Sequence, residues 1–237
     1  MGSIFSFKQF QVDQRGCAMK INTDGVILGA FSRFSSLAKD HRVLDIGTGT
    51  GVIAMMLAQR FETAIVDALE IDETAAQAAQ LNFLNAPFSD RLLVFTGDIA
   101  TFEAPDQYDL IVSNPPFFVN DLKSTEARKR LARHAATDFF ESMVAKSAEL
   151  LSDQGLLWLI LPVKQADLVI ELGLAKGLHQ IRVVNIHSDI DKPLIRKVIC
   201  LGRHIEDLKE ETFYIYESEK VYTAAYKALL KDFFLAF

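Results

Sequence analysis

The sequence predicts a single α/β domain built around a doubly wound, mostly parallel sheet of seven strands with an antiparallel hairpin at one edge. From residue 41 onward, short apolar runs rich in β-branched residues alternate with segments of helical periodicity. This alternation is typical of parallel strands joined by right-handed helical crossovers. A polar stretch, Ser188 to Pro193, separates the last two runs where a helix would otherwise stand. We therefore predict that these two strands form the hairpin.

Each predicted element rests on an apolar run or on helical spacing. The predicted strands are Arg42 to Ile46, Ala64 to Glu70, Leu92 to Gly97, Tyr108 to Ser113, Gly155 to Leu161, Ile181 to His187 and Arg196 to Gly202. Helices are predicted near residues 51–60, 72–85, 138–151 and 164–175. We divide the chain into an N-terminal segment (1–40), this core (41–204) and a C-terminal extension (205–237). Within the extension, residues 211–216 favour a strand and Tyr222 to Leu235 favour a helix.

Composition excludes several classes of protein. With 237 residues, 50% of them hydrophobic, the chain can bury one substantial core, and we expect no second full domain. Its two cysteines and five histidines lack ligand spacing, so neither a disulfide framework nor a metal site is expected. No segment has the apolar run of a signal peptide or a membrane-spanning helix, so we expect a soluble, cytoplasmic protein with no membrane partner. We expect it to act as a monomer.

A glycine-rich turn follows the first predicted strand directly. Asp45-Ile46-Gly47-Thr48-Gly49-Thr50-Gly51 opens a helix, and its glycines permit a tight turn and a close approach of the backbone to a ligand. A dinucleotide-binding turn would place its third glycine where Val52 stands, and here that glycine comes one residue earlier, at Gly51. This spacing favours a ligand without a pyrophosphate.

Two acidic residues end the next two predicted strands. Glu70 is placed to accept hydrogen bonds from ribose hydroxyls, and Asp98 to accept one from an adenine amine. Because the carboxyl ends of parallel strands meet at one edge of the sheet, the three strand ends together outline an adenosine site. The alternative is that the glycines form an ordinary turn and that both acids are simply solvated.

The segment Asn114-Pro115-Pro116-Phe117 ends the fourth predicted strand at the same edge. A primary amine on a base is a poor nucleophile, since its lone pair is delocalised into the ring. The Asn114 side-chain carbonyl and the Pro115 main-chain carbonyl can accept both amine protons, and Phe117 offers a face for base stacking. Beside an adenosine site, this arrangement predicts methyl transfer from S-adenosylmethionine to an amine. The alternative is a proline-rich strand terminator with a core phenylalanine.

Two further segments have both a functional and a structural interpretation. Lys20 to Gly25 precedes an apolar helix predicted over Val26 to Phe34, and its Thr23 and Asp24 can serve as a helix cap or can contact the charged end of a cofactor. Phe117 to Ala136, predicted as a mobile loop, has a local charge of about +3 that can bind RNA phosphates, or it is an ordinary solvated helix face. The basic residues are Lys123, Arg128, Lys129, Arg130 and Arg133.

At these residues the sequence resembles class I, Rossmann-like amino-methyltransferases with an Asn-Pro-Pro-aromatic motif, which act on adenine, guanine or a glutamine side chain. Over nearly the whole chain it is similar to the bacterial tRNA1(Val) (adenine-37-N(6))-methyltransferase family. The segments that carry this resemblance are Phe5 to Phe10, Cys17 to Lys20, Thr23 to Gly25 with Gly29 and Ala30, Asn114 to Pro116, and Tyr222 to Phe234.

The resemblance implies a tRNA substrate, methylated on the adenine that lies 3′ of the anticodon in a valine tRNA. It also implies that the N-terminal segment covers the cofactor. The residues expected at the S-adenosylmethionine site are Lys20, Thr23, Asp45, Gly47, Thr48, Gly49, Gly51, Glu70, Ile71 and Asp98.

Two alternatives to this activity stay open at the level of sequence. Adenine-specific members often carry Tyr where Phe117 stands, and Phe occurs in relatives that methylate guanine in ribosomal RNA. A protein glutamine is a further acceptor for this reaction, although those relatives usually carry a separate helical domain before the catalytic one. A non-catalytic binding module would have no need for two acceptors aimed at an amine.

Overall fold

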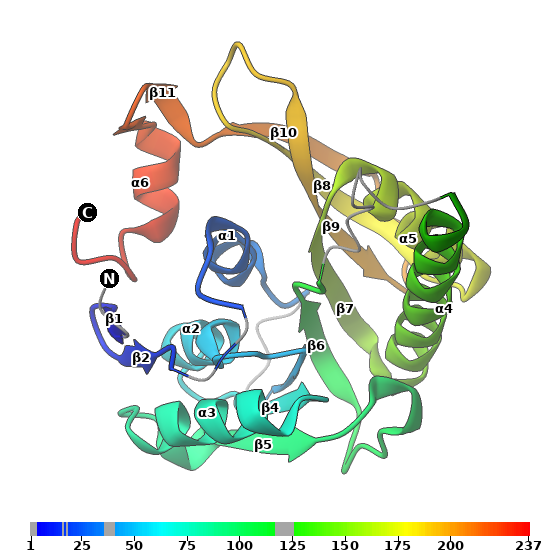
Figure 1. Ribbon diagram of the computed structural model, residues 1–237, viewed down its shortest axis with the longest axis horizontal. Helices are drawn as coiled ribbons and strands as arrows, with labels where there is room; N and C mark the ends of the chain where they lie inside the picture. Colours follow the sequence, from blue (N-terminus) through cyan, green and yellow to red (C-terminus); the bar gives the residue numbers. More distant parts are fainter. Residues whose placement is uncertain (1–3, 16, 18, 36–40, 117–125) are drawn as a thin grey trace.

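The computed structural model describes residues 4–15, 17, 19–35, 41–116 and 126–237, with the side chains of 126–135 left aside. Its centre is an eight-stranded sheet in the order β10-β8-β9-β7-β6-β3-β4-β5, with helices on both faces (Figure 1). The strands are β3 (Arg42–Ile46), β4 (Ile65–Glu70), β5 (Leu92–Thr96), β6 (Tyr108–Ser113), β7 (Leu151–Leu161), β8 (His179–His187), β9 (Leu194–Gly202) and β10 (Lys209–Tyr214).

The helices divide between the two faces according to the alternation of side chains along the strands. Adjacent residues Val43 and Leu44 of β3 point to opposite faces and belong to separate core clusters. Helices α1 (Thr23–Phe31), α2 (Val52–Arg60), α3 (Glu73–Leu84) and α6 (Ala224–Leu230) contribute to the first cluster. Helices α4 (Glu126–Leu150) and α5 (Val163–Ala175) contribute to the second. The central strands are therefore apolar on both sides, as a covered parallel sheet requires.

The predicted fold class is confirmed, with a correction at one edge of the sheet. Strands β8 and β9 form the predicted antiparallel hairpin, and β9 also runs antiparallel to β7. The hairpin is not the edge, because β10 adds an eighth strand parallel to β8. The unpaired edge of β8 would otherwise expose its backbone groups, and β10 satisfies them while burying Phe213 against Phe31 of α1. The seven-strand prediction was wrong because it left residues 211–216 outside the sheet.

Helix α4 begins well before its predicted start at residue 138. Residues 126–136, expected as a loop, are helical from Glu126 onward, and residues 117–125 lie outside the described part of the chain. The helical stretch contains alanine, arginine, lysine and leucine, all strong helix formers, and has neither glycine nor proline. The charge pattern was therefore recognised, but the prediction of a loop there was wrong.

The two ends of the chain pack together beside α1. A short N-terminal hairpin, β1 (Ile4–Ser6) and β2 (Gln11–Asp13), was not predicted, since three-residue strands give little periodicity. Phe7 bridges to Phe234, and the Lys8 Nζ donates to the Phe237 carbonyl at 2.8 Å. A second small hairpin, β11 (Tyr216–Ser218) and β12 (Val221–Tyr222), leads into α6.

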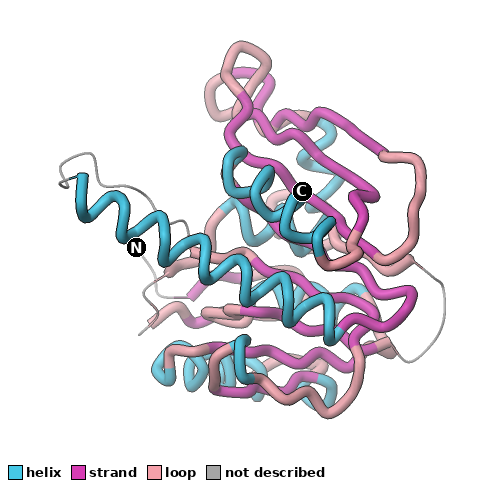
Figure 2. Tube along the Cα trace, turned by 90° about the vertical axis from the view of Figure 1, so that its right-hand side faces the viewer, coloured by secondary structure: helices cyan, strands magenta, loops and turns pink. Residues whose placement is uncertain are grey.

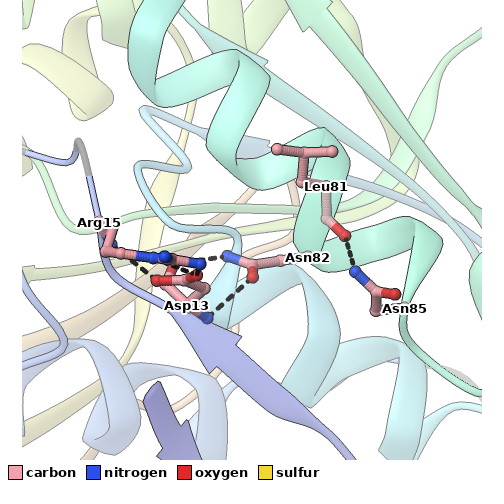
Figure 3. A network of polar contacts seen from close by, with 5 residues as sticks. All are labelled: Asp13, Arg15, Leu81, Asn82 and Asn85. Carbon is pink, nitrogen blue, oxygen red and sulfur yellow. Dashed lines mark hydrogen bonds and ion pairs between the residues drawn. The ribbon is translucent and has the colours of Figure 1, made fainter. Parts of the chain in front are cut away.

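Asn82 of α3 joins the N-terminal hairpin to the glycine-rich turn. Figure 3 shows its contact with Asp13 of the hairpin. Its Oδ1 accepts from the Asp13 N–H at 2.8 Å, and its Nδ2 donates to the carbonyls of Asp13 (3.0 Å) and Thr50 (2.9 Å). The residue is buried, and its amide oxygen and both amide protons are hydrogen-bonded where water cannot readily replace the partners. One amide thus fixes two segments that are distant in sequence.

We predict that Asn82→Ala lowers the free energy of unfolding by about 2–3 kcal/mol, because three partners lose a buried hydrogen bond at once. The measurement is urea denaturation. Asn85, at the C-cap of the same helix, is the matched control, since among the described residues its exposed amide bonds the Leu81 carbonyl alone (Figure 3). Asn85→Ala should change stability by less than about 0.5 kcal/mol. Equal losses in the two variants would contradict the role given to Asn82.

Candidate functional site

A cavity of about 350 Å³ opens at the carboxyl ends of β3, β4, β5 and β6. Ligands of open α/β sheets bind at this edge. Eight residues singled out from the sequence line the cavity: Gly47, Gly49, Glu70, Ile71, Asp98, Asn114, Pro115 and Pro116. The three predicted strand ends therefore do converge on one space.

Glycine is required at three positions of the turn between β3 and α2. Gly47, Gly49 and Gly51 have φ angles of 70°, 57° and 82°, in the left-handed region that other residues rarely adopt. A Cβ on Gly51 would lie 2.4 Å from the Phe83 ring, whereas a Cβ on Gly47 or Gly49 would meet nothing within 4 Å. Gly51 therefore serves packing against α3, and the other two leave open space beside the cavity.

The Glu70 carboxylate holds two neighbouring loops together. Its Oε2 accepts from the Gly49 N–H at 2.9 Å and its Oε1 accepts from the Asp72 N–H at 3.0 Å. The side chain is only 8% exposed and lies on the cavity wall. Each carboxylate oxygen retains a further lone pair for a ligand. Glu70 therefore shapes the turn and is also available as an acceptor.

Asp45 supports the turn from behind and does not line the cavity. Its Oδ2 accepts from the Thr48 hydroxyl at 2.7 Å and from the Ala54 N–H at 3.2 Å. The side chain is completely buried, and this burial raises the pKa of Asp45 to about 7. Asp45, Thr48 and Gly51 thus stabilise the conformation of the turn. They do not line the cavity, and their predicted contact with the cofactor stays a prediction.

Asn114 lines the cavity and carries a buried acceptor that is unused among the described residues. Its Nδ2 donates to the Asn22 Oδ1 at 3.5 Å, while its own Oδ1 is buried and has no hydrogen-bond partner among the described residues. A buried acceptor without a partner is costly in a folded protein, so a ligand donor is the expected partner. Pro115 is buried beside it and Pro116 is exposed. Phe117 lies outside the described residues.

The segment that leads into α1 carries two of the predicted cofactor residues, and their contact with the cofactor stays a prediction. Lys20 and Thr23 are exposed, and neither lines the cavity. Asp24 forms an ion pair with Arg196 of β9, with its Oδ2 2.8 Å from the arginine Nε. Asp98 does line the cavity, and its carboxylate also accepts from the Ala100 N–H at 2.9 Å.

The predicted basic residues map to the start of α4. Arg128, Lys129, Arg130 and Arg133 lie in its first turns, although their side chains are not described, and Lys123 falls outside the described residues. Figure 2 shows these turns extending beyond the body of the protein. Further along the same helix, Phe139 lines the cavity. The helix therefore connects the cavity wall to the basic turns.

Several lining residues were missed by sequence reasoning. They are Cys17, Met19, Ile46, Leu69, Asp72, Ala75, Gly97, Ile99, Ser113 and Phe139. Most flank a predicted residue at a strand end, so the strand assignment itself was the available signal. Cys17 and Met19 come from the N-terminal segment, where no periodicity marks them. Burial, followed by the charges of Glu70 and Asp72, raises the pKa of the Cys17 thiol, which favours its neutral form.

The described lining of the cavity is rich in acceptors. Glu70, Asp72, Asp98 and Asn114 contribute carboxylate or amide oxygens, and the described lining residues include neither lysine nor arginine. This set of acceptors fits a neutral or positively charged ligand that carries hydroxyl and amine groups, and it does not fit a pyrophosphate. Across the described residues, no three His, Cys, Asp or Glu side chains are grouped to hold a metal ion. None of the described helices combines the length and hydropathy needed to span a bilayer.

The sequence is similar to a known family of proteins. The family model described as "Methyltransferase small domain" matches residues 30–190. A Pedobacter heparinus protein named tRNA1(Val) (adenine(37)-N6)-methyltransferase is 53% identical over 237 residues, covering 100% of both chains. A Flavobacterium psychrophilum protein of the same name is 38% identical, covering 98% of this chain and 99% of that one.

The fold is also shared with a solved structure of low sequence identity. The predicted O-methyltransferase Atu636 from Agrobacterium tumefaciens superimposes with a TM-score of 0.70 at 18% identity, covering 89% of this chain and 96% of that one. At this identity the similarity extends to the fold alone.

The buried Asp45 predicts a specific dependence of stability on pH. Because its folded pKa of about 7 lies above its ordinary value of 3.8, the folded state keeps a proton that the unfolded chain releases between those values. The contribution of Asp45 to stability is therefore complete below about pH 4 and falls as the pH rises toward 7. Relative to wild type, Asp45→Asn should gain about 2–4 kcal/mol of unfolding free energy between pH 4 and 8. Urea titrations that give a pH-independent difference would contradict this burial effect.

Proposed function

Since the chain belongs to the tRNA1(Val) (adenine(37)-N6)-methyltransferase family, we propose that it transfers a methyl group from S-adenosylmethionine to the exocyclic amine of adenine 37 in a valine tRNA. This base lies 3′ of the anticodon. The observation that carries the proposal is the buried Oδ1 of Asn114, a residue of the acceptor-rich cavity, which has no partner among the described residues. An amine proton is the donor that this oxygen lacks.

The cavity residues divide into roles toward the cofactor. When bound, S-adenosylmethionine supplies a methyl group on a positively charged sulfur. Glu70 accepts from the ribose hydroxyls, Asp98 accepts from the adenine amine, and the exposed Ile71 side chain gives an apolar surface for the adenine ring. The open space beside Gly47 and Gly49 lets the backbone approach the ligand closely.

The remaining residues of the cofactor assignment have a less direct part. Asp45, Thr48 and Gly51 hold the turn in its conformation from the side away from the cavity. The assignment of Lys20 and Thr23 rests on the family resemblance. Lys20 and Thr23 belong to the N-terminal segment (1–40), which we propose covers the methionine end of the cofactor. Their exposed side chains leave them accessible for that contact.

Asn114 and Pro115 orient the reacting amine. The Asn114 Oδ1 and the Pro115 carbonyl accept the two amine protons, which favours a pyramidal nitrogen whose lone pair is localised and points at the methyl group. Two consecutive prolines keep this part of the backbone extended, so the acceptors are held before the substrate arrives. Phe117 provides the face on which the extruded base stacks. Catalysis in this arrangement depends on orientation and fixed dipoles.

The basic turns of α4 are proposed to bind the tRNA backbone. Arg128, Lys129, Arg130 and Arg133 give phosphate contacts on the helix that also carries Phe139, and Lys123, which lies outside the described residues, is proposed to add one more. We propose that the protein acts as a monomer and that the reaction takes place in the cytoplasm, where a bacterial tRNA is found.

We predict that Asn114→Ala lowers the rate of methyl transfer roughly a hundredfold, the loss seen when one positioned polar group is removed. Affinity for S-adenosylmethionine should stay within a few-fold of wild type, because the cofactor acceptors are elsewhere. The measurements are single-turnover transfer to a valine tRNA transcript, nucleoside mass spectrometry and calorimetric titration of the cofactor.

A transcript with guanine at position 37 is the matched substrate control. Methylation of the adenine transcript alone supports the proposed base. Transfer to the guanine transcript at an equal rate would favour a guanine acceptor, the alternative suggested by Phe117. An Asn114→Ala chain that loses rate and cofactor affinity equally would refute the role of Asn114.

We further predict that neutralising Arg128, Lys129, Arg130 and Arg133 together weakens tRNA binding and flattens its dependence on salt. If each residue neutralises one phosphate, the slope of log affinity against log salt should fall by roughly three to four units. The choice of adenine should be retained, since these residues contact the backbone. A wild-type slope in the quadruple variant would place the tRNA on another surface.

A further inference from the structure

The residue before α1, Asn22, links that helix to the reaction centre. Its Oδ1 accepts from the Gly25 N–H at 2.9 Å, capping α1, and lies 3.5 Å from the Asn114 Nδ2. Asn22 does not line the cavity. We infer that Asn22 is a positioning residue, which orients the Asn114 amide so that its Oδ1 faces the reacting amine. This inference rests on the proposed function.

The orientation of both amides follows from one backbone group. A backbone N–H can only donate, so the Asn22 atom that bonds Gly25 must be the oxygen. The same oxygen faces Asn114, and only the NH₂ group of Asn114 can donate to it. The Asn114 Oδ1 is thereby directed to the remaining side, where it is buried without a partner among the described residues. The oxygen and nitrogen positions of a side-chain amide are usually ambiguous, and here the sequence of donors and acceptors from Gly25 to Asn114 fixes them for both residues.

The position of Asn22 is itself fixed by the anchoring of α1. Near its start, Asp24 pairs with Arg196 of β9 at 2.8 Å. At its end, the Arg60 guanidinium donates to the carbonyls of Ala30 (2.6 Å) and Ser32 (2.8 Å). Since α1 is held at both ends, the Asn22 oxygen is a fixed acceptor and not a group that follows Asn114.

Loss of this acceptor would free the Asn114 amide to turn over. In the reversed orientation its NH₂ group would face the amine protons of the substrate, which are also donors. Enzyme molecules with the amide in this orientation would be unproductive. At 3.5 Å the contact is long for a hydrogen bond, so its orienting effect is modest. We expect about a three- to tenfold loss of transfer rate, with cofactor affinity within about twofold of wild type.

The test compares two substitutions that both keep the helix cap. Asn22→Ser retains a hydroxyl that can accept from Gly25, but this side chain is one bond shorter and does not reach Asn114. Asn22→Asp retains an acceptor of the original length toward both partners. Thermal unfolding of both variants should stay within a few degrees of wild type. The transfer rate on the adenine-37 transcript should fall in Asn22→Ser, and Asn22→Asp should recover most of the loss.

A double-mutant cycle separates positioning from a general structural effect. If Asn22 acts through Asn114, adding Asn22→Ser to Asn114→Ala should cause no further loss of single-turnover rate. A wild-type rate in Asn22→Ser, an equal loss in Asn22→Asp, or a multiplicative loss in the double variant would each overturn the inference. Wild-type chain that leaves the transcript unmethylated would instead refute the proposed function, and this outcome is read before any variant is compared.

Discussion

The two hydrogen bonds of Glu70 are the interaction on which the rest of the cavity depends. They join the turn after β3, through Gly49, to the chain after β4, through Asp72. The backbone N–H groups of Gly47 and Thr48 also donate to the Leu69 carbonyl, at 2.8 and 3.2 Å. The buried carboxylate and these backbone bonds together set the spacing between the two strand ends, and the acceptors of the cavity lie at fixed positions relative to them.

The same principle recurs at the cavity margins. Asn82 ties the N-terminal hairpin to the turn, and Asn22 ties α1 to Asn114. In each case a short polar side chain binds a backbone or side-chain group that is distant in sequence. Such contacts are directional, whereas the apolar packing around them is not. The sheet and its helices thus supply the volume of the domain, and a few amides and carboxylates define the geometry of the site.

Much of the fold could be predicted because apolar runs and turn residues are local signals. Strands β3 and β6 have the predicted bounds. Each is an apolar run covered by helices on both faces, and each is followed closely by a residue that ends a strand, Gly47 after β3 and Pro115 after β6. β10 carries charged residues at its start and lies at an edge, so its pairing with β8 depends on tertiary contact. The start of α4 was missed because its charge pattern resembles that of a loop as much as that of a helix.

The candidate site was predictable to a similar depth. Strand-end residues such as Glu70, Asp98 and Asn114 line the cavity because topology alone brings them together. Lys20 and Thr23 do not line it, and Cys17 and Met19 do, because the path of the N-terminal segment is decided by long-range contacts such as that of Asn82. No periodicity in the sequence encodes those contacts.

The continuous helix α4 has a geometric consequence for a bound nucleic acid. At 1.5 Å per residue, Arg128 stands about 16 Å from Phe139 along the helix axis. An uninterrupted helix bends little over such a distance, so the separation between the outer turns and the cavity is nearly fixed. A polynucleotide whose phosphates bind the outer turns would have a nucleotide at that fixed distance along its strand. This nucleotide would reach the cavity because of its position, before any contact with its base.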